Sequence, residues 1–275
     1  MAIPDPDRVA KTYRVGRKDR VDLDAYDPGD DGGLAKGKGR DALATDLDKL
    51  DRLQEKLYAS ARHAVLVVIQ AMDTGGKDGM TRRVLGPLNA QGVRVTSFKR
   101  PTDRELAHDF LWRVHREAPP KGMIGVFNRS HYEDVLVPRV HDLVPRKVIE
   151  ERYEQINDFE KLLAHNGTAI VKIFLHISRS EQKERLQARL DDPEKHWKFD
   201  RADLAERKLW KKYMHAYEHA ISACNTRSAP WYVVPANHKW YRNLVVARIM
   251  RHTLEELDLE FPKAAEGIEN LAIDD

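Results

Sequence analysis

Residues 63–79 read HAVLVVIQAMDTGGKDG, and the order of residues here indicates the class of fold. Its first eight residues contain the apolar run 64–69 and have the length expected for a buried strand. The run leads into a turn that contains Gly75 and Gly76, and Lys77 follows at the start of a helical pattern. Adjacent glycines let backbone N–H groups approach an anion closely, and the start of a helix favours negative charge. The stretch therefore predicts a strand, a phosphate-binding loop and a helix.

The loop differs from the common pattern G-x-x-x-x-G-K-[ST] at two positions. Ala71 stands at the first Gly position, and Asp78 stands where Ser or Thr normally binds Mg²⁺. Asp73 adds a carboxylate beside the expected phosphates, which is tolerable if a divalent cation lies between them or if Asp73 positions the acceptor phosphate. We predict that Asp73 acts through Mg²⁺, or through Mn²⁺ in its place. The loop residues expected at the phosphates are Thr74, Gly75, Gly76, Lys77, Asp78 and Gly79.

The composition excludes several classes of protein. The chain has 275 residues, enough for one large α/β domain or two small ones, and 41% of them are hydrophobic. The single cysteine, Cys224, excludes an intramolecular disulfide framework. The first residues lack the apolar core of a signal peptide, and the longest apolar stretch, residues 64–69, is too short for a membrane span. We therefore expect a cytoplasmic protein with no membrane partner.

Apolar runs alternate with helical patterns along most of the chain. This alternation predicts a five-stranded parallel sheet between two layers of helices, in one domain over residues 41–257. Residues 1–40 are expected to form an arm with little structure, and residues 258–275 an acidic tail. The expected strands are 63–70, 93–98, 122–127, 168–177 and 231–234, and the expected helices are 41–62, 77–90, 104–116, 147–165, 179–190, 202–222 and 238–257. Ligands should bind at the carboxyl ends of the strands.

A second group of polar residues follows the third expected strand, in GVFNRSHYEDVLVPRV at residues 125–140. Asn128 takes the place where many phosphate-loop enzymes have an Asp that organises Mg²⁺. Arg129 is suited to a bidentate grip on phosphate oxygens and to neutralising charge on the phosphoryl group in transfer. Glu133 and Asp134 come one turn later. We predict catalytic roles for Arg129, Glu133 and Asp134, while a salt bridge at a strand end remains the alternative for Arg129.

The residues after the fourth expected strand have the charge of a mobile helical lid. Between residues 179 and 212 there are 11 Lys or Arg and 8 Asp or Glu. Arg185 and Arg189 lie four residues apart, on one helix face, and are the candidates for contact with phosphate. An ordinary charged helix pair is an equally good interpretation for any single residue of this segment. Further cations for a phosphate channel are Arg82, Arg83 and Lys99.

Taken together, these segments resemble the polyphosphate kinase 2 family over about residues 57–250. The resemblance rests on AMDTGGKDG, SFKRPT at 97–102, HDFLWRVH at 108–115, FNRSHYEDVLV at 127–137 and the lid run from SEQKERLQARL to HWKFD. The motif FNRSHYED is similar to the class III branch, since other branches carry Asp at the position of Asn128. The resemblance implies a thymidylate-kinase-like phosphate-loop fold, three-layered α/β/α, with a helical lid. It also implies association into homodimers or homotetramers.

The resemblance further implies Mg²⁺-dependent transfer of phosphate from inorganic polyphosphate to AMP and ADP, giving ADP and ATP, with guanine nucleotides as further candidates. Asp73 and Lys77 match the family's functional pair in the phosphate loop, and Arg129 matches the arginine after the third strand. Glu133 and Asp134 match the acidic pair of class III. Because Asn128 replaces an Asp, the metal ligand is open, and we favour Asp73 with Asp134.

Two other functions compete with this one. An ATP-dependent nucleoside or nucleotide kinase could use the same fold, since fold alone does not fix the donor. A nucleic-acid-binding module could use the basic lid, and it would bind oligonucleotides in a salt-sensitive way without turnover. The net charge of only +3 and the carboxylates in the phosphate loop argue against a nucleic-acid partner.

Overall fold

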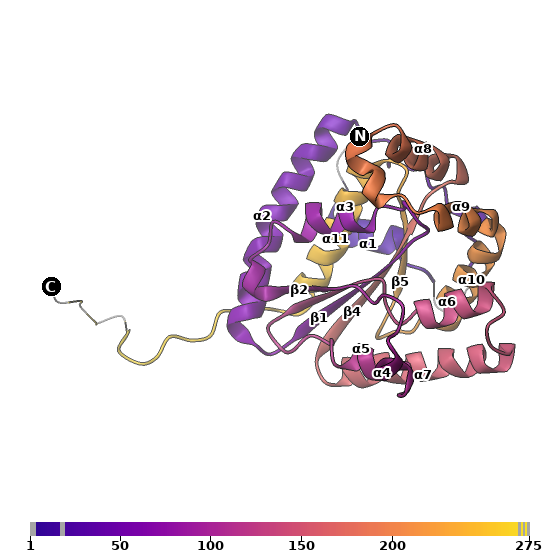
Figure 1. Ribbon diagram of the computed structural model, residues 1–275. Helices are drawn as coiled ribbons and strands as arrows, with labels where there is room; N and C mark the ends of the chain where they lie inside the picture. Colours follow the sequence, from indigo (N-terminus) through magenta and orange to yellow (C-terminus); the bar gives the residue numbers. More distant parts are fainter. Residues whose placement is uncertain (1–3, 17–19, 269–270, 272, 274–275) are drawn as a thin grey trace.

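The sheet places the carboxyl ends of five parallel strands along one edge (Figure 1). The structure is a computed structural model, and it describes residues 4–16, 20–268, 271 and 273. The strand order is β2-β3-β1-β4-β5, and every neighbouring pair is parallel. The strands are β1 (Ala64–Gln70), β2 (Val93–Thr96), β3 (Ile124–Asn128), β4 (Thr168–His176) and β5 (Trp231–Pro235). The expected five-stranded parallel sheet is therefore confirmed.

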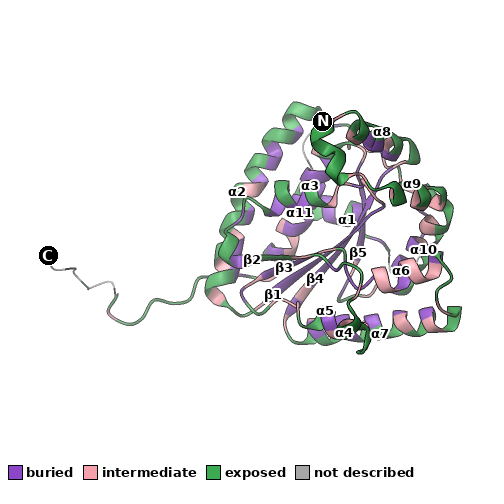
Figure 2. Ribbon diagram, viewed as in Figure 1, coloured by how far each residue is buried: buried purple, intermediate pink, exposed green. Residues whose placement is uncertain are grey.

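Helices cover both faces of the sheet, and their buried sides form two hydrophobic clusters (Figure 2). All seven residues of β1 are buried, because a central parallel strand has a helix layer on each side. One face is covered by α1 (Pro6–Tyr13), α2 (Lys36–Ser60), α3 (Lys77–Met80) with the π turn η2 (Thr81–Leu85), and α11 (Lys239–Glu255). The other is covered by α5 (Trp112–His115), α6 (Glu133–Val140), α7 (Arg146–His165) and α10 (Trp210–Ala223).

The lid follows β4 and consists of α8 (Arg179–Leu190), the short helix η4 (Pro193–Lys198) and α9 (Arg201–Lys208). Short elements complete the fold, namely η1 (Leu23–Ala25), η3 (Ala90–Gly92) and α4 (Asp103–Leu106). No helix in the described part of the chain is long and apolar enough to cross a membrane. After α11 the chain still packs on the protein at Leu259, which belongs to the core, and at Phe261, whose ring lies under Arg52. The described residues beyond this point run away from the body of the protein (Figure 1).

Several expected helices differ from the structure. The helix expected over 77–90 ends at Leu85. Gly86 still has helical dihedrals, with φ of −64° and ψ of −28°, but Pro87 follows it and has no N–H group to continue the helical hydrogen bonds. The helix expected over 104–116 is two short helices, α4 and α5, with a turn between them in which Asp109 accepts a hydrogen bond from Leu111 N. The helix expected over 202–222 is divided at Leu209 into α9 and α10.

Helix α6 was not among the expected helices. Pro138 lies inside it, although proline normally interrupts a helix. The expectation of little structure over residues 1–40 is wrong for α1, where Asp5 caps the helix by accepting from Arg8 N. Val9, Ala10 and Tyr13 of α1 are buried against the rest of the protein. Residues 1–3 and 17–19 of that expected arm lie outside the described residues.

Candidate active site

The phosphate loop, residues 71–79, joins β1 to α3 at the carboxyl edge of the sheet. Gly75 N donates to Met72 O at 2.9 Å, and a Cβ at Gly75 would lie 2.8 Å from that oxygen, so only glycine fits. Gly76 has φ of 99° and comes directly before α3. Thr74 also has positive φ, at 62°. The two glycines thus have the conformational role that the sequence predicts for them.

Lys77 folds back over the loop, where its Nζ donates to Ala71 O at 2.9 Å. Burial lowers the pKa of the Lys77 ammonium, while the negative charges of Glu133 and Asp73 act in the opposite direction. Lys77 is therefore half-buried, and it lies among carboxylates and close to backbone groups that can bind a phosphate.

Arg129 and Glu133 come to the loop from the end of β3 and the first turn of α6. Arg129 Nη2 lies 4.0 Å from Asp73 Oδ1, and its backbone has φ of 82°, which is strained for a residue with a side chain. Burial raises the pKa of Glu133, and the charges of Lys77 and Arg129 oppose this rise. Asp73, Lys77, Arg129 and Glu133 therefore form one electrostatically coupled group.

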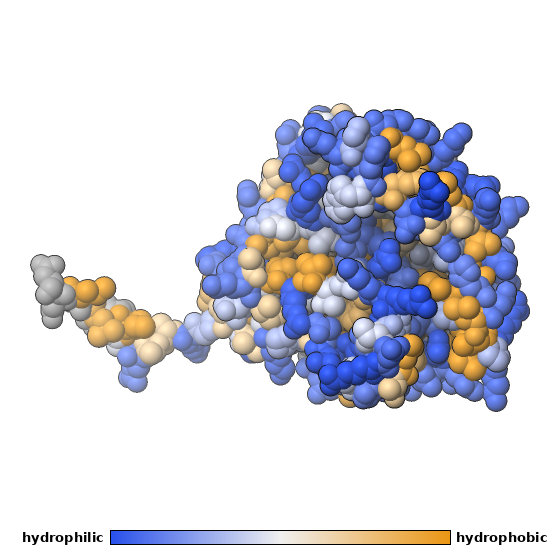
Figure 3. All heavy atoms as spheres, viewed as in Figure 1, coloured by the Kyte–Doolittle hydropathy of each residue, from blue (hydrophilic) through white to orange (hydrophobic). Residues whose placement is uncertain are grey.

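A cavity of about 410 Å³ lies beside the phosphate loop. Asn128 and Asp78 line it together, and Asn128 Nδ2 donates to Asp78 Oδ1 at 2.7 Å. Arg82 is exposed at its rim. Its other lining residues are Thr81, Leu85, Gly86, Leu88, Ala90, Val93 and Val95. In Figure 3 a hollow with mainly hydrophilic walls opens between the lid and the surface over α5 and α6.

Asp134 is engaged elsewhere. Its Oδ2 lies 3.3 Å from Arg113 Nη2, and Arg113 also donates to Lys99 O at 2.8 Å. Burial raises the pKa of the Asp134 carboxyl, and the charge of Arg113 opposes this rise. The structure thus gives Asp134 a cationic partner of its own, and its role as a metal ligand stays a prediction. Lys99 and Arg83 are exposed, so both side chains are accessible to a phosphate that arrives from solution.

The two lid arginines have different positions. Arg185 is buried and holds the phosphate loop, because its Nη1 donates to Thr74 O at 3.0 Å and its Nη2 to Asn237 O at 3.1 Å. Arg189 lies within the lid, where its Nη1 donates to Lys198 O at 2.9 Å and stands 3.7 Å from Asp203.

Two residues near the loop had no signal in the sequence. Gln182, on α8, donates from Nε2 to Asp73 O at 3.0 Å and accepts from Arg207 of α9 at 2.7 Å. Arg242, on α11, packs its guanidinium against Gly76 and Gly79. Gln182 and Arg242 do not lie at a fixed spacing from the loop in the sequence, because each reaches the loop from a helix that is distant along the chain. An uncharged residue and an arginine in a helix look like ordinary helix residues in the sequence.

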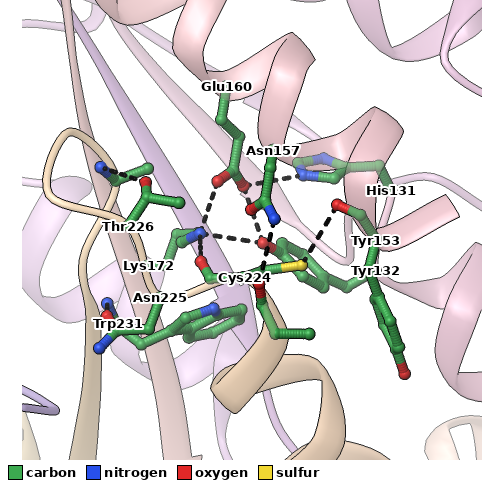
Figure 4. Close-up of polar contacts among 12 residues, drawn as sticks. His131, Tyr132, Tyr153, Asn157, Glu160, Lys172, Cys224, Asn225, Thr226 and Trp231 are labelled. Carbon is green, nitrogen blue, oxygen red and sulfur yellow. Dashed lines mark hydrogen bonds and ion pairs between the residues drawn. The ribbon is translucent and has the colours of Figure 1, made fainter. Parts of the chain in front are cut away.

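A buried charged network includes His131 and Tyr132, which belong to the turn between β3 and α6 (Figure 4). Lys172 of β4 and Glu160 of α7 form an ion pair with no exposed surface. Glu160 Oε1 accepts from Tyr132 Oη at 2.9 Å and lies 3.2 Å from His131 Nε2. Burial alone would raise the pKa of Glu160, but Lys172 and His131 outweigh it and hold that pKa below its usual value. Two residues of the turn are therefore tied to α7 and β4.

The polar groups at the loop suit a hard divalent cation. Among the buried side-chain oxygens of the described structure that have no hydrogen-bond partner, four belong to the loop and the elements next to it, namely Gln70 Oε1, Thr74 Oγ1, Thr81 Oγ1 and Asn128 Oδ1. No group of three His, Cys, Asp or Glu that could hold a metal occurs among the described residues. Mg²⁺ is usually held by one or two carboxylates together with substrate phosphates, and oxygen ligands also suit Mn²⁺. Asp73 with such oxygens fits this pattern.

A parallel sheet with a Gly-Gly-Lys loop after its first strand, an arginine after β3 and a lid after β4 defines a phosphate-loop phosphotransferase. A model of the polyphosphate kinase 2 family matches residues 33–262, and the chain belongs to this family.

Characterised relatives and a solved structure agree with this assignment. The chain is 52% identical to AMP/ADP-polyphosphate phosphotransferase of Meiothermus ruber, over 96% of this chain and 100% of that protein. It is 45% identical to ADP-polyphosphate phosphotransferase of Rhodopseudomonas palustris, over 92% of each chain. The crystal structure of polyphosphate kinase 2 from Arthrobacter aurescens superposes with a TM-score of 0.92 at 46% identity, covering 97% of this chain and 95% of that one.

Proposed function

We propose that this protein transfers the terminal phosphoryl group of inorganic polyphosphate to ADP and to AMP, giving ATP and ADP. Membership of the polyphosphate kinase 2 family supports polyphosphate as the donor. The observation that carries the mechanism is the convergence of Asp73, Lys77 and Arg129 at the phosphate loop. The relative from Meiothermus ruber, named as acting with AMP and ADP, supports both acceptors.

The reaction exchanges one P–O bond for another. An oxygen on the terminal phosphate of ADP or AMP forms a bond to the last phosphorus of polyphosphate, and the bond from that phosphorus to the bridging oxygen breaks. The electron pair stays on the bridging oxygen, so the shortened polyphosphate leaves as an anion. The attacking oxygen is already ionised at neutral pH, so no general base is required. Positioning and charge neutralisation then account for most of the rate enhancement.

Each charged side chain of the site has a part in this mechanism. Lys77 and Arg129 neutralise charge that builds up on the transferring phosphoryl group. The backbone N–H group of Gly76 binds one of its oxygens, while the N–H of Gly75 remains bonded to Met72 O. Asp73 would hold Mg²⁺, which would supply Lewis-acid neutralisation of the phosphate oxygens when bound. Glu133 maintains the orientation of Lys77 and Arg129 through its opposite charge.

The test mixes purified protein, ADP, Mg²⁺ and long-chain polyphosphate, and follows ATP with luciferase. The wild type should form ATP, and AMP should be converted to ADP in a parallel reaction. Lys77→Ala should lose about 10²-fold or more in kcat, by analogy with the loss of one preorganised charge donor. Lys161→Ala, at an exposed position on α7, should match the wild type.

Near-normal turnover by Lys77→Ala would reject the assigned mechanism. ATP-driven phosphorylation of an acceptor, with no use of polyphosphate, would instead identify an ATP-dependent nucleoside or nucleotide kinase. Use of guanine nucleotides, assembly into a homodimer or homotetramer and a cytoplasmic location complete the proposal. Parallel assays with GDP, light scattering and cell fractionation test these three points.

A further inference from the structure

Arg242 is a buried cation without an anionic partner. Only 3% of its surface is exposed, and its Nε and Nη2 donate to the neutral Oδ1 of Asn243, at 3.1 and 2.8 Å. No carboxylate pairs with Arg242 among the residues that the structure describes. Burial and the nearby charge of Arg185 lower the pKa of the Arg242 guanidinium to about 10. An unpaired buried charge is destabilising, and an anion bound from outside the chain would compensate the charge of Arg242.

The guanidinium of Arg242 points at the phosphate loop. A Cβ on Gly76 would clash with Arg242 Nη1, and a Cβ on Gly79 would lie 3.8 Å from Arg242 Nη2. Gly76 therefore serves two purposes, since it has positive φ and leaves space for the guanidinium. Arg185 Nη1 lies 3.4 Å from the same Cβ position, so two guanidinium groups meet at Gly76.

Positive charge continues from this point along the first turn of α11. Arg185 joins the loop to the segment before α11, through Thr74 O on one side and Asn237 O on the other. Lys239 is the first residue of α11, it is exposed, and no side chain caps the helix. Burial and the charges of Arg185 and Arg242 act to lower the pKa of Lys239, while Glu181 opposes this. Glu181 is also the one carboxylate that pairs with Arg185 in the described structure.

The opposite side of the loop has carboxylates as well as cations. Asp78 is exposed there beside Asn128, and Asp73 faces Arg129. A polyanion longer than the loop must extend past one side or the other. On the β3 side the carboxylates of Asp73 and Asp78 alternate with the cations Arg129 and Arg82. On the α11 side Arg242 has no carboxylate partner among the described residues, and the uncapped helix end adds to its attraction for an anion.

We propose that polyphosphate extends from the phosphate loop along the N-terminal turn of α11, with Arg242 and Lys239 binding phosphate units behind the one that is transferred. This inference rests on the proposed function and adds the direction in which the donor runs. The ligand of this subsite is an unbranched chain of phosphates. The nucleoside part of a nucleotide could occupy this position instead. The experiments below distinguish the two ligands, because only a nucleotide site would change KM for ADP.

The first experiment compares donors of different length. Lys239→Gln should raise KM for long-chain polyphosphate about tenfold, the loss of one charge-assisted hydrogen bond. It should leave KM for ADP unchanged and should affect tripolyphosphate, which barely exceeds the loop, much less. Lys161→Gln is the matched control. An equal effect on short and long donors, or a raised KM for ADP, would overturn the proposal.

The second experiment separates binding from structure. Arg242→Met replaces an unpaired buried charge with an apolar side chain of similar length, so Tm of the free protein should stay the same or rise. The rise in Tm that long-chain polyphosphate causes in the wild type should be lost. A lower Tm with the polyphosphate-induced rise intact would show that Arg242 is purely structural. If the wild type shows no such rise and makes no ATP from polyphosphate, the proposed function fails.

Discussion

Arg129 Nη2 lies 4.0 Å from Asp73 Oδ1, so the first residue after β3 and the carboxylate of the phosphate loop face each other across the sheet edge. The two residues are 56 positions apart in the sequence (129 minus 73). Parallel pairing of β1 with β3, in which Ile69 is opposite Asn128, brings them together. This pairing of charges is the basis of the first two predictions.

Arg129→Gly should lower activity without lowering stability. The φ of 82° is strained for arginine, and glycine removes the strain but adds entropy to the unfolded chain, so the free energy of unfolding should change by roughly 0–1 kcal/mol. The loss of the guanidinium should lower kcat by about 10²-fold or more. Ala61→Gly, at another residue of positive φ, is the control and should keep full activity. Steady-state kinetics and urea unfolding measure both quantities, and an active Arg129→Gly would contradict the role of Arg129.

Asp73→Asn should weaken the response to metal. If Asp73 holds Mg²⁺, the Mg²⁺ concentration for half-maximal activity should rise about 10- to 100-fold. Asp134→Asn should raise it less, because Asp134 already pairs with Arg113 at 3.3 Å. Titrations with Mg²⁺ and Mn²⁺ after treatment with EDTA measure these shifts. A larger shift for Asp134→Asn would make Asp134 the principal metal ligand.

Lys172→Met should destabilise the protein, because it leaves the Glu160 carboxylate buried without its cation. Removal of one partner of a buried ion pair costs about 3–5 kcal/mol. Glu160→Leu should have a similar effect, and the double variant should lose less than the sum of the two, since neither charge is then left alone. Urea unfolding of the four proteins gives the coupling energy. Strict additivity would show that the pair contributes no specific interaction.

Glu133→Gln should change the pH dependence of stability. Burial raises the pKa of Glu133 above its usual 4.5, so the folded state holds its proton more tightly than the unfolded state. Glu133 therefore makes its whole contribution to the free energy of unfolding below pH 4.5, and this contribution is lost as the pH rises through the pKa of the folded state. Relative to the wild type, Glu133→Gln should gain stability as pH rises through that window. Unfolding without metal or ligand measures it, and a constant difference across pH would contradict the raised pKa.

The sequence by itself determined the class of fold and the main parts of the site. The alternation of strands and helices predicted the parallel sheet, because each apolar run of strand length needs a helix layer on both faces. The glycines at 75 and 76 and Lys77 predicted the phosphate loop, because these residues must be consecutive to bind a phosphate. Both features depend on which residues are neighbours along the chain, and this can be read directly from the sequence.

Tertiary structure alone decided which side chains meet. Asp134 pairs with Arg113, Arg185 holds the loop, and Arg242 reaches Gly76 from α11, and no spacing along the chain predicts any of these contacts. Helix α6 forms in spite of Pro138, because its buried residues pack against α7 and α10. Contacts between distant elements depend on strand order and helix packing, and these are set by burial across the whole protein rather than by local pattern.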